Sequence, residues 1–259
     1  KKISLMVACY NEVENVEPLS HQLIECMERE LPEYDYELLF IDNRSTDGTR
    51  EKLEKLCAEN RKIKAIFNIT NFGQMRSPVY GMKQTTGDCT IKLCADFQDP
   101  IEMIPQFVRE WEKGARIVIG IKTRSKENKL MYLLRGFYYR LFNKLSNIQH
   151  IQQFTGFGLY DRSFVDIVRQ IDDPIPYFRG IVAEFGGSDR VEIPYTQPKR
   201  RAGKSKNNLL SLYDIAMTAM TTYSKGLMRL SVLTGGICAA LSLLVSLVYT
   251  IYKLLNWNT

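Results

Sequence analysis

The stretch "CTIKLCADFQDP", residues 89–100, decides the fold because an apolar run passes directly into a turn rich in carboxylate and amide side chains. Residues 89–95 have the character of a buried strand, and Asp96, Gln98 and Asp99 follow at once. In α/β proteins, ligands bind beyond the carboxyl ends of the parallel strands. The stretch therefore predicts a strand that ends at a binding site, and it raises the question of whether the turn holds a metal.

Strand-like segments alternate with segments of helical spacing through the N-terminal half of the chain. The strand-like segments are 3–10, 36–42, 63–68 and 89–95, and the helix-like segments are 16–31, 49–60 and the region around 75–86. Such alternation is typical of an α/β fold with a doubly wound, mostly parallel sheet. The polar sequences "YNE", "DNRSTDG" and "ADFQD" follow three of these strands, so we expect them to meet at one edge of the sheet.

The 259 residues carry a formal net charge of +6 and include two histidines and six cysteines. A basic balance suits nucleic acid, an anionic membrane surface or phosphorylated substrates. The scarcity of histidine, with no H-x-x-x-H sequence, argues against a zinc hydrolase. The cysteines form no C-x-x-C pair and several lie in apolar runs, so we expect reduced, mostly buried thiols.

The segment 230–252, "LSVLTGGICAALSLLVSLVYTIY", contains no charged residue. As a helix it would be roughly 34 Å long, slightly more than the hydrocarbon core of a bilayer, so we predict a transmembrane helix. Such a helix argues against a nucleic-acid-binding protein. Lys225 and Arg229 precede it and Lys253 follows, so the positive-inside rule places the larger N-terminal part in the cytoplasm, at the cell (inner) membrane. The chain stops at Thr259, so either one span is present or a further span has been removed.

Three motifs occur in an informative order: "ACYNE" at 8–12, "DNRSTDGT" at 42–49 and "CADFQDP" at 94–100. They resemble the motifs P-x-Y-N-E-x-x-N, D-D-G-S-x-D-G-T and D-x-D-x-Q-D-P of family 2 glycosyltransferases with the GT-A fold. "FRGIVAEFG" at 178–186 and "KRRAGKSK" at 199–206 are similar to the polyprenyl-phosphate branch of that family. This branch includes dolichol-phosphate mannose synthase and bacterial bactoprenol glucosyltransferases, and the resemblance covers nearly the whole chain.

The resemblance implies an inverting, metal-dependent hexosyltransferase that moves one sugar from a nucleotide-sugar to a polyprenyl phosphate on the cytoplasmic membrane face, in cell-wall or O-antigen glycan biosynthesis. UDP-glucose is the first expectation for the donor, with GDP-mannose and UDP-N-acetyl sugars as alternatives, and relatives of this kind form homotetramers. A processive polysaccharide synthase is disfavoured because Trp111 and Trp257 lie outside any Q-x-x-R-W sequence. A membrane scaffold on a decayed transferase fold stays an alternative, since Cys94 and Gly156 replace family aspartates.

Two further segments, 128–148 and 207–230, combine apolar and aromatic residues with basic ones. Packing against the core would account for such helices, but their place next to a membrane helix favours amphipathic helices in the membrane interface. The predicted organisation is a GT-A catalytic domain over 1–206, which includes the interfacial helix 128–148, then a juxtamembrane helix over 207–229 and the transmembrane helix over 230–252.

Departure of a diphosphate requires neutralisation of its developing charge, which a hard divalent ion on carboxylate or amide oxygens supplies. Asp96 and Gln98 offer such oxygens, so we predict an Mg²⁺ or Mn²⁺ site at this turn. Cys94 stands where relatives have the first aspartate, and a thiol is a poor ligand for magnesium, so the site has one ligand fewer. Asp99 is expected to cap the helix that follows and not to bind metal.

The resemblance also implies roles for individual residues. Asp42 is expected to accept a hydrogen bond from the nucleobase, and the full set expected to bind nucleotide is Ala8, Tyr10, Glu12, Asp42, Asn71, Gln74 and Asp96. Arginine grips phosphate oxygens in pairs, and the residues expected to bind the diphosphate or the acceptor are Arg124, Arg135, Arg200, Arg201 and Lys204. The expected catalytic residues are Asp96, Arg124 and Arg135. No general base is assigned, because Gly156 replaces an aspartate and a lipid phosphate is already largely a dianion at neutral pH.

Overall fold

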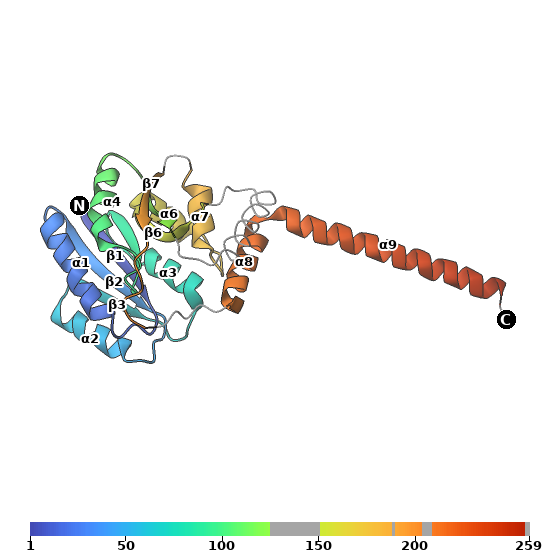
Figure 1. The fold of residues 1–259 in the computed structure, drawn as a ribbon, viewed down its shortest axis with the longest axis horizontal. Coiled ribbons are helices and arrows are strands. Elements are labelled where there is room, and N and C mark those ends of the chain that lie inside the picture. Colours follow the sequence, from blue (N-terminus) through green and yellow to red (C-terminus); the bar gives the residue numbers. More distant parts are fainter. Residues whose placement is uncertain (125–150, 188–189, 204–208, 257–259) are drawn as a thin grey trace. The chain divides into compact units, whose positions relative to one another are not determined.

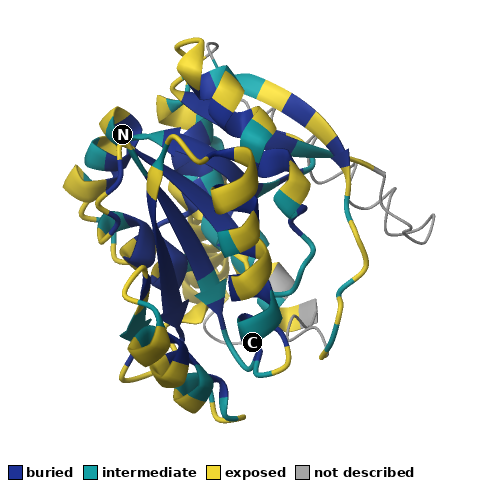
Figure 2. Ribbon diagram, turned by 90° about the vertical axis from the view of Figure 1, so that its left-hand side faces the viewer, coloured by how far each residue is buried: buried dark blue, intermediate teal, exposed yellow. Residues whose placement is uncertain are grey.

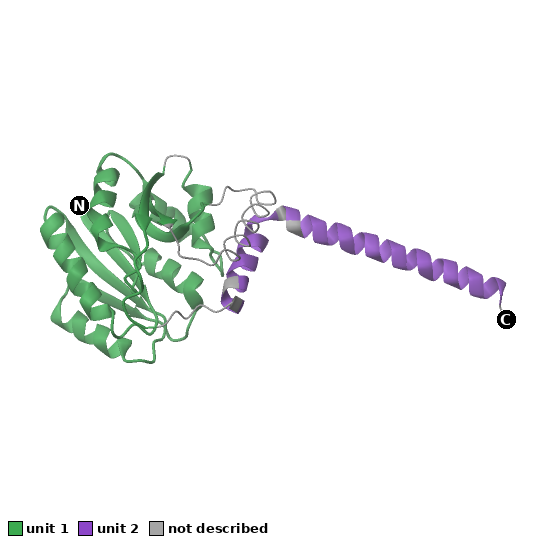
Figure 3. Ribbon diagram, in the orientation of Figure 1, with its two compact units in different colours: residues 1–133, 150–207 green, residues 134–149, 208–259 purple. Residues whose placement is uncertain are grey.

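The computed structural model describes residues 1–124, 151–187, 190–203 and 209–256 (Figure 1). The chain divides into two compact units (Figure 3). The first comprises residues 1–133 and 150–207, and the second comprises 134–149 and 208–259. The predicted interfacial helix 128–148 lies outside the described residues.

A sheet of seven strands forms the centre of the first unit, in the order β3-β2-β1-β4-β6-β5-β7. The strands are β1 (Lys2–Cys9), β2 (Asp35–Asp42), β3 (Ile63–Phe67), β4 (Cys89–Cys94), β5 (Ile117–Arg124), β6 (Phe154–Asp161) and β7 (Val191–Thr196). Only β6 runs antiparallel to its neighbours β4 and β5 in this sheet, and all other described pairs are parallel. The predicted mostly parallel sheet is confirmed.

Helices cover both faces of this sheet. They are α1 (Val16–Glu30), α2 (Thr49–Glu59), α3 (Gly73–Lys83), the 3₁₀ helix η1 (Ile101–Met103), α4 (Ile104–Glu112), α6 (Arg162–Gln170) and α7 (Phe178–Phe185). Successive residues of β1 enter different cores, because side chains alternate across a strand. Leu5 packs with α1, α2 and α4, whereas Met6 packs with α3, α6 and α7. The buried strands between exposed helix faces (Figure 2) are those of the predicted doubly wound α/β fold.

A buried carboxylate stabilises the amino end of the sheet. Glu37 of β2 is 2% exposed and accepts hydrogen bonds from Ser4 Oγ at 2.6 Å and from the backbone N–H of Thr86 at 2.7 Å. Its other oxygen pairs with the ammonium groups of Lys2 at 3.0 Å and Lys64 at 2.7 Å. Burial alone would raise the pKa of Glu37, but these donors lower it well below its usual range.

The second unit contains α8 (Leu209–Tyr223) and α9 (Lys225–Leu255). The predicted unbroken helix over 207–230 is wrong, because the chain leaves helical geometry at Ser224, a residue type that favours helix N-termini. Residues 228–255 of α9 form a helix long and apolar enough to cross a membrane, with a mean hydropathy of 2.1, and they contain the predicted span. The boundaries predicted for the juxtamembrane and membrane segments stay predictions.

Candidate functional site

Three turns meet at the carboxyl edge of the sheet, where β1, β2 and β4 end in register. Cys9 is paired with Asp42 and Ala8 with Cys94. Each turn contains one residue other than glycine with a left-handed backbone: Asn11 (φ 56°), Arg44 (φ 66°) and Phe97 (φ 61°). Such backbones cost free energy and occur mainly where the surrounding structure imposes them, often at functional sites. The predicted meeting of the three polar sequences is confirmed in this geometry.

Hydrogen bonds join the first turn to the second. The backbone N–H of Asn11 donates to Ser45 Oγ at 2.8 Å, and the Asn11 side-chain oxygen accepts from the backbone N–H of Thr46 at 2.8 Å. Asp42 is fully buried, and its carboxylate accepts from the backbone N–H of Ser45 at 3.2 Å. Its expected bond to a nucleobase stays a prediction.

Asn43 extends this network to Asn71, one of the residues expected to bind nucleotide. Its side-chain nitrogen donates to Asn71 Oδ1 at 2.8 Å, and its oxygen accepts from the backbone N–H of Phe72 at 2.9 Å. The second predicted residue, Gln74, is exposed in the first turn of α3. Asn43 was not among the residues predicted from the sequence, although its place directly after Asp42 at a strand end was a usable signal.

The carboxylate turn after β4 is closed by its own backbone. Asp96 Oδ1 accepts from the backbone N–H of Gln98 at 3.1 Å, and Asp99 Oδ2 accepts from the backbone N–H of Cys94 at 2.9 Å. The prediction that Asp99 caps the following helix is wrong, because neither η1 nor α4 has a side-chain cap and Pro100, next in the chain, has no N–H to donate. Burial raises the pKa of Asp99 to about 6, against the opposing effect of the Lys92 charge.

The basic loop reaches both the first and the third turn. The Arg200 guanidinium donates through Nη1 to Asp96 Oδ2 at 3.2 Å and through Nη2 to Glu12 Oε1. The three side chains are 19%, 14% and 9% exposed in the order Arg200, Asp96, Glu12. The Arg201 guanidinium lies over the ring of Phe97, 5.0 Å from its centroid. The structure therefore brings together four predicted site residues, Glu12, Asp96, Arg200 and Arg201.

Asn15 is a buried member of this cluster that the residue assignments missed. It is 1% exposed, and its side-chain nitrogen donates to Glu12 Oε2 at 2.6 Å and to the carbonyl of Ala202 at 3.4 Å. Burial raises the pKa of Glu12, while the bonds from Asn15 and Arg200 oppose that rise. The signal was present, because Asn15 is the last residue of the motif P-x-Y-N-E-x-x-N, which begins here at Ala8.

Two more residues that were expected to bind nucleotide, Ala8 and Tyr10, lie at the end of β1. Both are half-buried. Arg135 and Lys204 lie outside the described residues, and Arg124 is described only through its backbone at the end of β5.

Gly156 and Lys92 adjoin on neighbouring strands. Lys92 of β4 is 8% exposed, and a Cβ added to Gly156 of β6 would lie 2.9 Å from its ammonium nitrogen. Gly156 also has φ 99°, which side-chain-bearing residues rarely adopt. Position 156 therefore has no room for the aspartate of related sequences unless Lys92 moves.

The hard oxygens of Asp96 and Gln98 suit Mg²⁺ or Mn²⁺, whereas the Cys94 thiol does not. Within the described ranges, no group of three acidic, cysteine or histidine side chains is placed to hold a metal. The Asn15 side-chain oxygen is buried without a hydrogen-bond partner in the described structure, a polar group available to a ligand. The residues fit a metal that takes most of its ligands from outside the chain.

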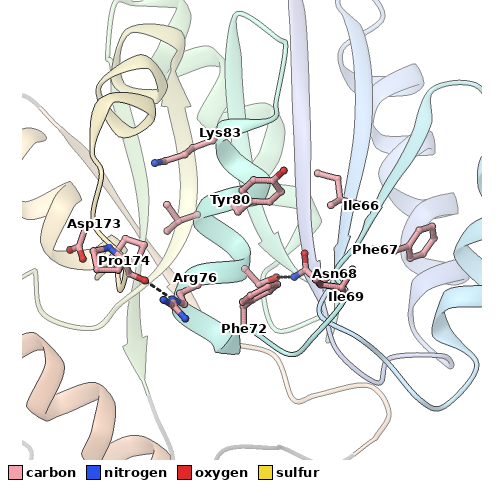
Figure 4. A pocket seen from close by; sticks show the side chains of 13 residues that line it. Ile66, Phe67, Asn68, Ile69, Phe72, Arg76, Tyr80, Lys83, Asp173 and Pro174 are labelled. Atoms are coloured by element: carbon pink, nitrogen blue, oxygen red, sulfur yellow. Dashed lines mark hydrogen bonds between the residues drawn. The ribbon is translucent and has the colours of Figure 1, made fainter.

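A cavity of about 550 Å³ lies away from this cluster, between the end of β3, α3 and the segment before α7 (Figure 4). Ile69, Phe72 and Tyr80 line it, and Arg76 closes one side by donating to the carbonyl of Pro174. Among the predicted substrate and metal residues whose side chains the structure describes, none lines this cavity. Its lining residue Phe72 donates through the backbone N–H to Asn43, so the cavity adjoins the Asn43–Asn71 side of the candidate site.

Comparison with known proteins gives a consistent result. The model of the family described as "Glycosyl transferase family 2" matches residues 4–168. The chain is similar to the bactoprenol glucosyl transferase of Shigella phage SfX, with 30% identity over 94% of this chain and 79% of the relative. It is also similar to a prophage bactoprenol glucosyl transferase homolog of Escherichia coli K12, with 28% identity over 98% of this chain and 81% of that protein.

Solved structures share the fold at low identity. Mannosyl-3-phosphoglycerate synthase from Rubrobacter xylanophilus superposes with a TM-score of 0.56 at 16% identity, covering 85% of this chain and 73% of that one. Glucosyl-3-phosphoglycerate synthase from Mycobacterium tuberculosis, solved with Mn²⁺, UDP-glucose and phosphoglyceric acid, gives 0.53 at 15% identity, covering 86% and 78%. These likenesses support the fold.

Proposed function

The chain belongs to glycosyltransferase family 2, and from this premise we propose that it transfers one glucose from a nucleotide-sugar to a polyprenyl phosphate. The bactoprenol glucosyl transferases that match nearly the whole chain support this choice of sugar and acceptor. The observation that carries the proposal is the meeting of Asp96 with Arg200 at the carboxyl edge of the sheet. It joins a carboxylate suited to a metal–diphosphate unit with a cation suited to phosphate.

In the proposed reaction, Asp96 and Gln98 would hold Mg²⁺ or Mn²⁺, which neutralises the charge of the departing diphosphate when bound. Arg200 and Arg201 bind phosphate oxygens through their paired N–H groups. The acceptor phosphate is largely a dianion at neutral pH and attacks the anomeric carbon without a general base. A single displacement of this kind inverts the anomeric configuration, and positioning supplies most of the rate acceleration.

The donor we propose is UDP-glucose, and the acceptor lipid lies in the membrane that α9 crosses. Lys225 and Arg229, which precede the uncharged segment of α9, support a cytoplasmic face for the first unit. A lipid phosphate stays at the interface while its chain is in the bilayer, so the site must work at the membrane surface.

The test offers labelled UDP-glucose, GDP-mannose and UDP-N-acetylglucosamine separately, with undecaprenyl phosphate, to the full chain in detergent. Organic extraction then measures the lipid-linked sugar. We expect label from UDP-glucose alone, with the Asp96→Asn variant as the matched inactive control. Label from another donor would correct the sugar, and none from any donor would favour a scaffold on this fold.

A further inference from the structure

One guanidinium joins two carboxylates that come from different turns. Arg200 contacts Asp96 of the turn after β4 and Glu12 of the turn after β1, and all three side chains are largely removed from solvent. The two acidic residues, Glu12 and Asp96, lie 84 positions apart in the sequence. They share one guanidinium, because Asp96 Oδ2 accepts from its Nη1 and Glu12 Oε1 accepts from its Nη2.

The backbone of the loop is held at the same place. The backbone N–H of Arg201 donates to the Asp96 carbonyl at 3.4 Å, and the Ala202 carbonyl accepts from both Asn15 Nδ2 at 3.4 Å and Arg200 Nε at 2.8 Å. Both acidic turns therefore contact the loop through side chain and backbone. Arg200 is therefore held by the Ala202 carbonyl of its own loop as well as by the two carboxylates.

The pair of carboxylates has the chemistry of a divalent cation site. Two carboxylates that face a common cation, with the amide oxygen of Gln98 from the same turn, are hard donors of the kind that Mg²⁺ and Mn²⁺ prefer. The buried Asn15 oxygen without a partner in the described structure adjoins Glu12 and can accept a bond from a water on such a cation. In such a site Glu12 would supply a second carboxylate, where related sequences have an aspartate at the position of Cys94.

We propose that Glu12 and Asp96 form a two-carboxylate cation site held by the Arg200 guanidinium, and that a divalent cation enters it by displacing Arg200. The inference rests on the proposed function in one respect. It takes the cation to be the divalent ion that neutralises the charge of the departing diphosphate. One place accepts either the guanidinium or the metal, because both neutralise the same two carboxylates.

The experiment measures Mn²⁺ binding to the full chain in detergent by the loss of the free Mn²⁺ electron paramagnetic resonance signal, without nucleotide or lipid. Removal of a charge-assisted contact to the competing guanidinium should tighten Mn²⁺ binding about tenfold in Arg200→Gln. Arg201→Gln is the matched control, since it removes the same charge from the next residue, whose guanidinium lies over Phe97. It should bind Mn²⁺ nearly as the wild type does. Unchanged binding in Arg200→Gln, or equal tightening in both variants, would overturn the competition.

The contribution of Glu12 is tested with Arg200 already removed. Adding Glu12→Gln to Arg200→Gln should reverse most of the gain in Mn²⁺ affinity, whereas an unchanged affinity would mean that Glu12 only holds the arginine. Arg200→Lys keeps the charge but cannot bridge both carboxylates, so it should give a smaller gain, and thermal melting of each variant confirms folding. Tighter Mn²⁺ binding without sugar transfer from any donor would contradict the proposed function and leave this inference standing.

Discussion

The two ends of the central sheet each bury a carboxylate cluster, and the clusters are built differently. At the amino end, Glu37 has donors from the sheet strands and from Thr86 just before β4, and every oxygen is bonded. At the carboxyl end, Glu12 and Asp96 depend on Arg200, which is 188 residues from Glu12 in the sequence. A cluster bonded within the core stabilises the fold, whereas one that relies on a distant loop can exchange its cation.

The pKa directions of the two buried glutamates follow the same division. Fixed donors overcome burial at Glu37 and lower its pKa, whereas burial prevails at Glu12 and raises it. The comparison therefore predicts that changes at the amino end affect stability, and that changes at the carboxyl end affect binding and catalysis.

The largest effect is expected at the carboxyl end. Asp96→Asn keeps the size of the side chain but removes the charge that faces the metal and Arg200. Lipid-linked sugar formation should fall at least about a hundredfold, as when a main electrostatic contact of an active site is lost. The melting temperature should change little. Activity within several-fold of wild type would remove Asp96 from the metal site.

The corresponding change at the amino end is Glu37→Gln. It leaves Lys2 and Lys64 without their carboxylate and should lower the free energy of unfolding by about 2 kcal/mol at pH 7, measured by denaturation of the full chain. Nucleotide binding per folded molecule should be unchanged. A loss of nucleotide affinity with normal stability would break the division between the two ends.

The same variant makes a pH prediction with a defined sign. The pKa of Glu37 is lowered in the folded state, so its stabilisation is fully present above the unfolded value of about 4.3 and is lost as the pH falls through the folded pKa. The stability difference between wild type and Glu37→Gln should therefore be constant near neutral pH and shrink in acid. A difference that grows on acidification would contradict the assignment.

A smaller effect is expected from the paired change of Arg200 and Arg201 to glutamine. Each charge-assisted bond to phosphate is worth about 1.5–3 kcal/mol, so sugar transfer should fall at least about tenfold. Binding of free nucleotide should fall less, if one arginine serves the acceptor. Calorimetry with UDP in the same detergent makes the comparison, and equal losses would assign both arginines to the donor.

The smallest effect is expected at Cys94, two residues before Asp96, whose thiol is a poor magnesium ligand. Cys94→Ala should keep transfer within several-fold of wild type. A loss as large as that of Asp96→Asn would show that both positions act on the metal and would correct the ligand set.

Local patterns were sufficient to predict the first four strands, their helices and the edge where the polar turns meet. The spacing of apolar residues reveals these strands and helices because each element is formed by residues that are neighbours in the sequence. The antiparallel insertion of β6 between β4 and β5 depends on pairing between distant segments, which no local period encodes.

The site was predicted less completely for the same reason. Asp96 and the basic loop could be named from their motifs, but the contact of Arg200 with both carboxylates joins residues 104 and 188 positions apart. The helix break at Ser224 and the bond from Cys94 to Asp99 are decided by single residues within otherwise regular patterns.

The three left-handed residues at the carboxyl edge have a consequence for how this sequence can vary under selection. Glycine would relieve the backbone cost of about 1–3 kcal/mol at Asn11, Arg44 and Phe97, and β-branched residues would increase it. At position 97, however, glycine also removes the ring beneath Arg201. A library selected for thermal resistance alone should therefore accept glycine at residue 97, whereas one selected for sugar transfer should retain an aromatic residue there.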